Sequence, residues 1–169
     1  MAAAREVQIR AGGEADLPAI DVIYGHYVRE TPITFDVEPA THVARRAWLD
    51  PFAQRGPHRL LVAETEGRVV GWVATHVFRA KAAYASSAEV SIYLSPEATG
   101  CGVGSRLYAG LFEALASEDL HRLYAGVTLP NPASIALHRK FGFGSIGVFR
   151  EVGYKLGRYW DVEWFERAL

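Results

Sequence analysis

A glycine-rich junction between a predicted strand and a predicted helix constrains the fold of this chain most. In the stretch ATGCGVGSRLY, residues 98–108, glycine stands at positions 100, 102 and 104. The preceding AEVSIYL is typical of a strand, and the following residues place an apolar stripe at helical spacing through Val103, Leu107, Leu111 and Leu115. Glycine is favoured where the backbone needs a positive φ or where a ligand approaches the main chain. Because the first amides of a helix lack internal partners, this junction predicts a phosphate-binding site.

Other sites with a similar glycine pattern fit less well. A nucleotide-binding P-loop requires Lys-Ser or Lys-Thr after its last glycine, whereas Ser105 and Arg106 follow here. A dinucleotide-binding fold requires an acidic residue at the end of its second strand, but Glu118 and Asp119 precede the next predicted strand. A tight turn that binds no ligand is the remaining alternative at this stage.

Length and composition indicate one globular domain over residues 1–169. Half of the residues are hydrophobic, which is enough for a full core. The formal net charge of −1 and the lack of a long basic run argue against a nucleic-acid partner. One cysteine excludes an internal disulfide, and we find no signal peptide and no apolar run of membrane length. We therefore expect a cytoplasmic protein without a membrane partner or a bound metal.

Hydrophobic periodicity predicts strands and helices that alternate and then give way to strands. Pro18 suits the first turn of one helix and Thr41 is a candidate N-cap of the next. The predicted helices span 16–30, 41–52, 103–117 and 133–141. The predicted strands span 7–10, 59–65, 69–77, 88–94 and 122–128, with two more near 144–149 and 160–165.

A second group of residues, in the segment NPASIALHRKFGF, points to a known family. The sequence resembles the GNAT N-acetyltransferase superfamily, whose acetyl-coenzyme A loop reads Arg/Gln-x-x-Gly-x-Gly/Ala and whose later block reads Asn-x-x-Ala/Ser-x-x-x-Tyr-x-Lys-x-Gly-Phe. Thr99-x-x-Gly102-x-Gly104 matches the loop except at Thr99. The later block is matched by Asn131, Ser134, Lys140, Gly142 and Phe143, with His138 in place of the tyrosine.

A narrower resemblance covers nearly the whole chain, to the phosphinothricin and methionine sulfone/sulfoximine N-acetyltransferases within that superfamily. It rests on HYVRETPITFDVEP, FRAKAAY, AEVSIYL and VGYKLGRYWDVEWF, and His138 is typical of this subgroup. The resemblance implies an α/β (α+β) GNAT fold, with a mixed, mostly antiparallel sheet of about six to seven strands and helices on both faces. It also implies a homodimer.

The resemblance implies that acetyl-CoA binds at the glycine junction. The diphosphate would lie on the backbone amides of Gly100, Cys101, Gly102, Val103, Gly104 and Ser105. Thr99 can donate a hydrogen bond but brings no charge, so Arg106 or Lys140 would supply the cation. Asn131 and Ser134 would contact the pantetheine arm or only begin a helix. We expect Gly104→Val to crowd the diphosphate, and we interpret Cys101 as an incidental small residue rather than a redox switch.

Acetyl transfer requires a neutral amine, and Glu89 is the candidate general base. Glu89 alternates with Ser91 and Tyr93 on one face of a predicted strand whose other face is wholly apolar. A carboxylate placed in this way either faces a cleft or forms a structural ion pair. The family implies that a backbone amide near Leu94 polarises the thioester carbonyl. His138 would donate to the departing thiolate, or else is a histidine packed within its helix.

The acceptor site is less well defined by the sequence. The subgroup acetylates amino-acid-like molecules, so cations and hydroxyls are expected near the amine, and the candidates are Phe35, Arg79, Lys81 and Tyr84. Some members carry a second arginine where this chain has Ala85. Trp160 and Asp161 either line the same cleft or hold the sheet together.

The predicted function is acetyl transfer from acetyl-CoA to the primary amine of a small amino-acid-like acceptor. One alternative is an acetyltransferase that acts on protein lysine or N-terminal amines, which would need an open acidic groove. The other alternative is a catalytically silent CoA-binding module, which would be favoured if Glu89 and His138 were turned into the core.

Overall fold

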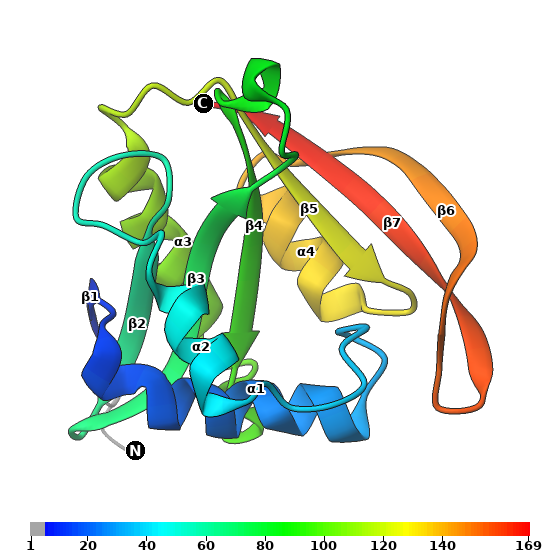
Figure 1. Ribbon diagram of the computed structural model, residues 1–169, viewed down its shortest axis with the longest axis horizontal. Helices are drawn as coiled ribbons and strands as arrows, with labels where there is room; N and C mark the ends of the chain where they lie inside the picture. Colours follow the sequence, from blue (N-terminus) through cyan, green and yellow to red (C-terminus); the bar gives the residue numbers. More distant parts are fainter. Residues whose placement is uncertain (1–5) are drawn as a thin grey trace.

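The computed structural model describes residues 6–169 and contains one sheet of seven strands in the order β1-β2-β3-β4-β5-β7-β6 (Figure 1). Only β4 and β5 pair in parallel, and all the other neighbours are antiparallel. The predicted mixed, mostly antiparallel sheet is therefore confirmed. The strands are β1 (Gln8–Ala11), β2 (Leu60–Thr65), β3 (Arg68–Val77), β4 (Ser87–Leu94), β5 (Arg122–Thr128), β6 (Gly144–Lys155) and β7 (Arg158–Ala168).

The helices begin where the sequence places their caps. Pro18 lies in the first turn of α1, and the Thr41 side chain accepts a hydrogen bond from the Ala44 amide at the start of α2. The prediction that this second helix continues to Phe52 is wrong, because Pro51 has no N–H to bond back into the helix. The helices are α1 (Leu17–Glu30), α2 (His42–Leu49), α3 (Val103–Leu115) and α4 (Pro132–Lys140), with short 3₁₀ turns η1 (Glu14–Asp16), η2 (Ala82–Tyr84) and η3 (Pro96–Ala98).

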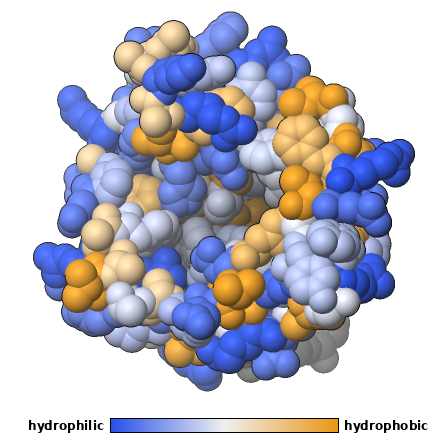
Figure 2. Space-filling view, turned by 45° about the vertical axis from the view of Figure 1, so that its right-hand side comes forward, coloured by the Kyte–Doolittle hydropathy of each residue, from blue (hydrophilic) through white to orange (hydrophobic). Residues whose placement is uncertain are grey.

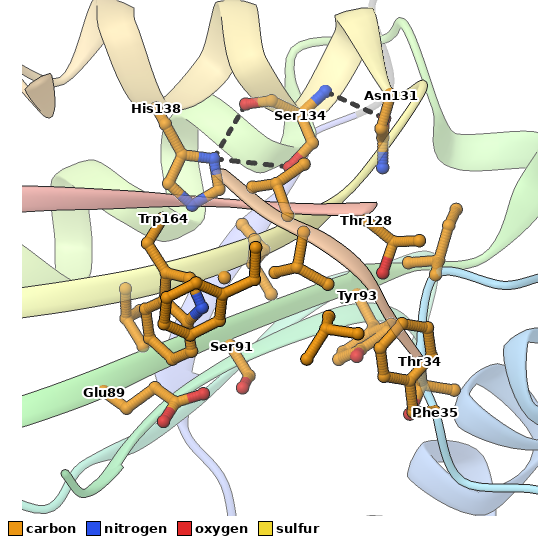
Figure 3. Close-up of a pocket in the computed structure, with 18 of the residues that line it drawn as sticks. Thr34, Phe35, Glu89, Ser91, Tyr93, Thr128, Asn131, Ser134, His138 and Trp164 are labelled. Atoms are coloured by element: carbon orange, nitrogen blue, oxygen red, sulfur yellow. Dashed lines mark hydrogen bonds between the residues drawn. The ribbon is translucent and has the colours of Figure 1, made fainter. Parts of the chain in front are cut away.

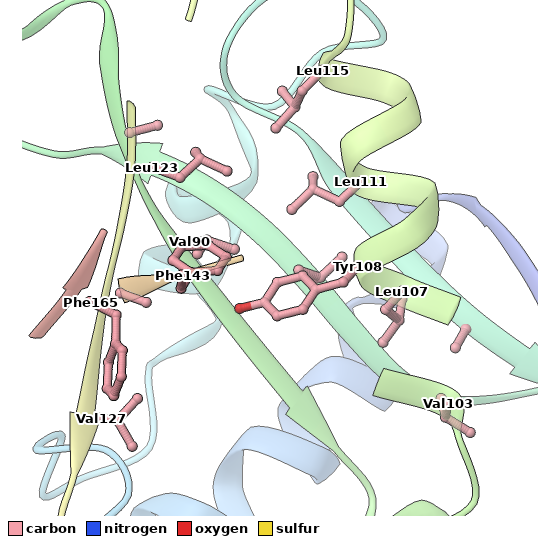
Figure 4. Packing of buried hydrophobic residues seen from close by; sticks show 14 of the residues in the cluster. Val90, Val103, Leu107, Tyr108, Leu111, Leu115, Leu123, Val127, Phe143 and Phe165 are labelled. Atoms are coloured by element: carbon pink, nitrogen blue, oxygen red, sulfur yellow. The ribbon is translucent and has the colours of Figure 1, made fainter. Parts of the chain in front are cut away.

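Helices cover both faces of the sheet, with α1 and α2 on one face and α3 and α4 on the other (Figure 1). The alternation of side chains along β3 serves both layers, since Trp72 packs toward α1 while Val73 packs toward α3. On the α3 side, Tyr108 and Leu111 point toward Val90 and Phe143 (Figure 4). The predicted placement of helices on both faces is confirmed.

The parallel strands β4 and β5 separate soon after they meet. Only three residue pairs join them, from Ser87↔Arg122 to Glu89↔Tyr124, whereas β3 and β4 stay paired from Ala88 to Leu94. Beyond Glu89 the two strands diverge (Figure 1). The backbone groups of β4 beyond Glu89 that face β5 therefore have no strand partner.

The C-terminal hairpin is longer than the predicted strands near 144–149 and 160–165. Leu156 and Gly157, both at positive φ, make a two-residue turn that joins β6 to β7. The register shifts between Phe149 and Gly153, and Glu151 in this bulge also has a positive φ. Such a bulge interrupts the alternation of apolar and polar residues, and the predicted strand near 144–149 therefore ends before β6 does.

Candidate active site

A cavity of about 470 Å³ occupies the gap between the diverging strands (Figure 3). Its walls come from β4, β5, β7, α4 and the loop that follows α1. The face that carries the C-terminal hairpin is hollowed at its centre, with hydrophobic side chains interspersed among hydrophilic ones around it (Figure 2). The polar groups that line the cavity include Thr34, Glu89, Ser91, Thr128, Asn131, Ser134 and His138.

Glu89 lines this cavity, as its position on the strand predicts. The neighbouring Ala88 and Val90 are buried in the α3 layer, so the alternation of β4 turns Glu89 and Ser91 to the opposite face. Among the described residues, the carboxylate of Glu89 has no recorded hydrogen bond and no ion pair within 4.0 Å. Burial raises the pKa of Glu89, and the charge of Arg79 partly opposes this effect. The alternative of a structural ion pair therefore has no support.

Only one of the four residues predicted to bind the acceptor lines the cavity, and that residue is Phe35. The guanidinium of Arg79 lies 4.3 Å from the centroid of the Phe78 ring and 6.0 Å from that of Trp164, so it stands at the Glu89 end of the cavity. Lys81 and Tyr84 are exposed beside the short turn η2, outside the cavity lining.

A second cleft of about 340 Å³ runs along the glycine junction. Gly102 is the N-cap of α3 with a φ of 81°, and Gly100 has a φ of 74°, so both adopt a backbone conformation that glycine favours. The cleft and the cavity share residues where they meet, including Asn131 and Ser134. The other residues of the cleft include Leu94, Thr99, Gly100, Gly102, Gly104, Ser105 and Leu137.

The backbone at the end of β4 faces this gap. The Ser95 amide donates to the Val70 carbonyl on the β3 side, so the alternation of the strand turns the amide and carbonyl of Leu94 the other way. Consistent with this orientation, the Tyr27 hydroxyl donates to the Leu94 carbonyl at 2.6 Å. The Leu94 amide is therefore directed toward the space between β4 and β5.

Three polar side chains near the glycine junction differ in their availability to a ligand. Lys140 extends from α4 and donates from Nζ to the Ser105 hydroxyl at 2.9 Å. The Thr99 hydroxyl donates to the Pro96 carbonyl at 2.7 Å, and Arg106 donates to the Val7 carbonyl at 3.1 Å. Arg106 belongs to the first turn of α3, but its side chain bonds to Val7, whereas the ammonium of Lys140 contacts Ser105 in that turn.

The environment of Gly104 bears on the expectation that a valine there crowds the diphosphate while the fold stays intact, because the position faces α4 as well as the cleft. A Cβ at position 104 would lie 3.1 Å from a methyl carbon of Leu137 and 3.7 Å from one of Leu94. Gly104 is buried in the first turn of α3, so a larger side chain there requires Leu137 to move.

His138 lies in the core with only 3% of its surface exposed. Its Nε2 is 2.8 Å from the buried hydroxyl of Tyr108, and its Nδ1 is 2.7 Å from the Ser134 carbonyl and 3.3 Å from the Ser134 hydroxyl (Figure 3). A carbonyl can only accept, so Nδ1 carries the proton and Nε2 accepts from Tyr108. Burial lowers the pKa of His138, although the hydrogen bond to Ser134 partly opposes this. His138 is thus a neutral imidazole with both nitrogens engaged.

Asn131 and Ser134 stand where the cleft meets the cavity. The Asn131 side chain caps α4 by accepting a hydrogen bond from the Ser134 amide at 3.1 Å (Figure 3). The hydroxyl of Ser134 lies on the same turn and contacts His138. Both readings of Asn131, as a cap and as a residue that lines the cleft, agree with its position.

Trp160 and Asp161 hold the C-terminal hairpin together. Trp160 donates from Nε1 to the Lys155 carbonyl at 2.8 Å, and its ring packs under the Arg158 guanidinium at 3.8 Å. The carboxylate of Asp161 accepts a hydrogen bond from the Glu151 amide at the bulge. Neither residue lines the cavity, so their contacts support the structural alternative.

Sequence reasoning did not identify Thr34, Thr128 and Trp164, which the fold brings to the cavity from three separate elements. Alternation along β7 could have identified Trp164, since Phe165 is fully buried and Trp164 must face the other way. Thr34 and Thr128 carry no comparable pattern, because they stand in a loop and at the end of a strand.

Three further findings concern metal ligands, membrane spans and the single cysteine. Residues 6–169 contain no group of three or more histidine, cysteine or acidic side chains that could hold a metal ion. Over the same residues, every helix is too short or too polar to cross a membrane. Cys101 is exposed, and its sulfur lies near backbone carbonyls of its own turn.

Comparison with known proteins gives consistent results. A model of the acetyltransferase (GNAT) family matches residues 20–143. A phosphinothricin N-acetyltransferase from Streptomyces coelicolor is 55% identical over 166 residues, with 97% of each chain covered. An L-methionine sulfoximine/L-methionine sulfone acetyltransferase from Pseudomonas aeruginosa is 33% identical over 95% of this chain and 94% of that protein. The crystal structure of a GNAT superfamily phosphinothricin acetyltransferase from Sinorhizobium meliloti in complex with AcCoA has a TM-score of 0.89 and 32% identity, covering 96% of this chain and 88% of that one.

Proposed function

Because this chain belongs to the acetyltransferase (GNAT) family, we propose that the glycine cleft holds acetyl-CoA and that the adjoining cavity holds the primary amine of a small amino-acid-like acceptor. One observation carries the proposal: an unpaired, partly buried carboxylate, Glu89, and the glycine junction open on the same gap between β4 and β5. The sequence resembles the phosphinothricin and methionine sulfone/sulfoximine acetyltransferases, and the similar proteins named above include enzymes of both kinds.

The residues of the cleft suit a thioester donor with a diphosphate. The free amides of the first turn of α3, from Gly102 onward, would hold the phosphate oxygens, with Lys140 as the nearby cation. Acetyl-CoA supplies an activated acetyl group when it is bound. The Leu94 amide, directed into the gap, would donate a hydrogen bond to the carbonyl oxygen where negative charge develops.

Glu89 would take the proton from the acceptor ammonium, either directly or through one water molecule. An alkyl ammonium has a pKa near 10, so little free amine exists at neutral pH without a base. Burial raises the pKa of Glu89 and so makes its carboxylate a better proton acceptor. A base in this position typically contributes about 10²–10⁴ in rate.

The contacts of His138 support an indirect role rather than direct proton donation to the leaving group. Its Nδ1–H is directed at Ser134, and its Nε2 is occupied by Tyr108. We propose that His138 is a positioning residue that holds the Ser134 hydroxyl at the junction of cleft and cavity. That hydroxyl would donate a hydrogen bond to the thiolate as the C–S bond breaks.

The cavity offers hydroxyls and an aromatic wall to an acceptor of the phosphinothricin or methionine sulfone type. Thr34, Ser91 and Thr128 supply hydroxyl groups, and Trp164 supplies the wall. The cavity lining contains no lysine or arginine from the described residues, so Arg79 at the Glu89 end is the candidate partner for an acceptor carboxylate. A catalytically silent module is the second candidate, because both ring nitrogens of His138 are engaged within the protein, whereas Glu89 has no such partner among the described residues.

We also propose a cytoplasmic homodimer. Strand β6 is one edge of the sheet and exposes several large apolar side chains, namely Ile146, Val148, Phe149, Val152 and Tyr154, of which Phe149 and Val152 also line the cavity. An apolar edge strand is a ready site for pairing or packing with another chain, and a second copy would cover it.

The test is to measure thiol release from acetyl-CoA with phosphinothricin, methionine sulfone, methionine sulfoximine, the free amino acids, and a peptide with free lysine and N-terminal amines. We expect turnover with one or more of the amino-acid analogues and little with the peptide. Faster turnover of the peptide would favour the protein-directed alternative. Binding of acetyl-CoA without turnover of any acceptor would favour the silent module.

A further inference from the structure

The C-terminal segment GYKLG contains two residues, Gly153 and Lys155, that contact the loop on the acceptor side of the cavity. We propose that these residues fix the position of that loop, residues 32–36, and so determine which acceptors fit. The inference rests on the proposed function, since it concerns the same cavity. It assigns Lys155 as a positioning residue for acceptor binding.

Lys155 is 5% exposed, and its ammonium group is held by backbone carbonyls. Nζ donates to the Thr34 carbonyl at 2.7 Å and to the Tyr27 carbonyl at 3.3 Å. Among the described residues, it makes no ion pair with a carboxylate within 4.0 Å. Burial lowers the pKa of Lys155, and the charge of Asp36 in the same loop partly opposes this effect. Because Asp36 makes no ion pair with it, the buried ammonium needs these hydrogen bonds to the carbonyls. The loop and the hairpin therefore hold each other in place.

The two carbonyls belong to different parts of the site. Tyr27 lies in the last turns of α1, and its hydroxyl donates to the Leu94 carbonyl at the edge of the cofactor cleft. Thr34 lies in the loop, and its hydroxyl is 2.6 Å from the Tyr24 hydroxyl at the wall of the cavity. One ammonium thus ties the acceptor loop to the helix that contacts the cofactor strand.

Gly153 provides the second contact. A Cβ at position 153 would overlap ring atoms of Phe35, so the ring packs directly on the glycine backbone. Phe35 and Thr34 both line the cavity at the end away from Glu89 (Figure 3). A side chain at position 153 would therefore push Phe35 and move this wall of the cavity.

The experiment compares Lys155→Met with Arg158→Met. The methionine keeps the length of the side chain but loses both hydrogen bonds to the carbonyls. Arg158 is the control because it lies on the same hairpin, is exposed, and stacks on Trp160 rather than on the loop. For each variant, the KM values of the acceptor and of acetyl-CoA, the kcat and the hydrogen exchange of residues 32–36 are measured.

For Lys155→Met we expect the acceptor KM to rise about tenfold or more, the acetyl-CoA KM to change by less than about twofold, and exchange in residues 32–36 to become faster. Arg158→Met should keep wild-type KM values and wild-type exchange in the loop. Equal changes in both KM values, or unchanged exchange in the loop, would overturn the proposal.

Gly153→Ala provides an independent test if Lys155→Met does not fold. It should change the ratio of kcat/KM between a short and a long acceptor, and an unchanged ratio would count against the proposal. If the wild-type protein acetylates no amino-acid analogue, the proposed function fails, whereas the exchange comparison still decides whether Lys155 fixes the loop.

Discussion

Replacing Glu89 with glutamine should lower kcat/KM by about 10²–10⁴, the usual contribution of a general base. This loss corresponds to about 2.7–5.4 kcal/mol of transition-state stabilisation. The side chain keeps its shape, and the carboxylate has no recorded hydrogen bond or ion pair among the described residues that the substitution could break. Acetyl-CoA affinity should therefore stay within about twofold of the wild-type value.

Although the activity of Glu89→Gln should fall, its folding stability at neutral pH should not. The pKa of Glu89 is raised in the folded state, mainly by burial. The folded state thus binds the proton more tightly than the unfolded state, and stability falls as pH rises from the unfolded pKa through the folded pKa. At neutral pH the ionised carboxylate costs folding free energy that glutamine avoids. We expect Glu89→Gln to be at least as stable as wild type at pH 7.

The pH profile of kcat/KM distinguishes the base from other roles. In the wild-type enzyme, activity should rise with pH through the raised pKa of Glu89 and through that of the amine. The Glu89→Gln variant should lose the rise of kcat/KM that is due to Glu89. Its kcat/KM should recover partly at alkaline pH, where free amine is abundant. A less stable variant with normal turnover and an unchanged pH profile would refute the assignment of Glu89 as the base.

Three further substitutions test the neighbouring parts of the site. Gly104→Val should destabilise the fold by about 1–3 kcal/mol in chemical denaturation, because its side chain would press on Leu137; an unchanged midpoint would contradict this packing. Thr99→Arg should tighten acetyl-CoA binding by about 0.5–1 kcal/mol at low salt, and calorimetry that finds no salt-dependent gain would show that the cation is already supplied. Tyr108→Phe should cost about 1–3 kcal/mol in stability by leaving Nε2 of His138 without a donor, and it should lower kcat more than acetyl-CoA affinity if His138 positions the site. An undiminished kcat in a folded Tyr108→Phe enzyme would remove the positioning role.

The sequence predicts the cofactor side of the site better than the acceptor side, for physical reasons. The glycine junction, Asn131 and Ser134 lie on continuous segments whose spacing is set by a turn or a helix, so local pattern reveals them. The face on which Glu89 lies follows from simple alternation along β4.

The acceptor cavity instead depends on contacts between distant segments. Lys155 reaches Thr34 across a separation of 121 residues, and this contact has no local signature. The charge of Lys81 favours a role in binding the acceptor, but Lys81 lies at the start of a short 3₁₀ turn that leaves it exposed and outside the cavity lining. The sequence predicts the helix that carries His138. Only the structure shows that both ring nitrogens of His138 form hydrogen bonds, with Tyr108 and Ser134.

The three-pair contact between β4 and β5 places Glu89 at the last point where the two strands are joined. If the angle between the strands changed, each residue would be displaced in proportion to its distance from that point. Because β4 stays paired with β3, the strand that moves is β5. Thr128 lies four residues beyond Tyr124, the partner of Glu89, about 13 Å away, so a rotation of about 5° would move Thr128 by about 1.1 Å and Glu89 hardly at all. Such a motion would widen the cavity for entry and release of ligands while Glu89 stays in place.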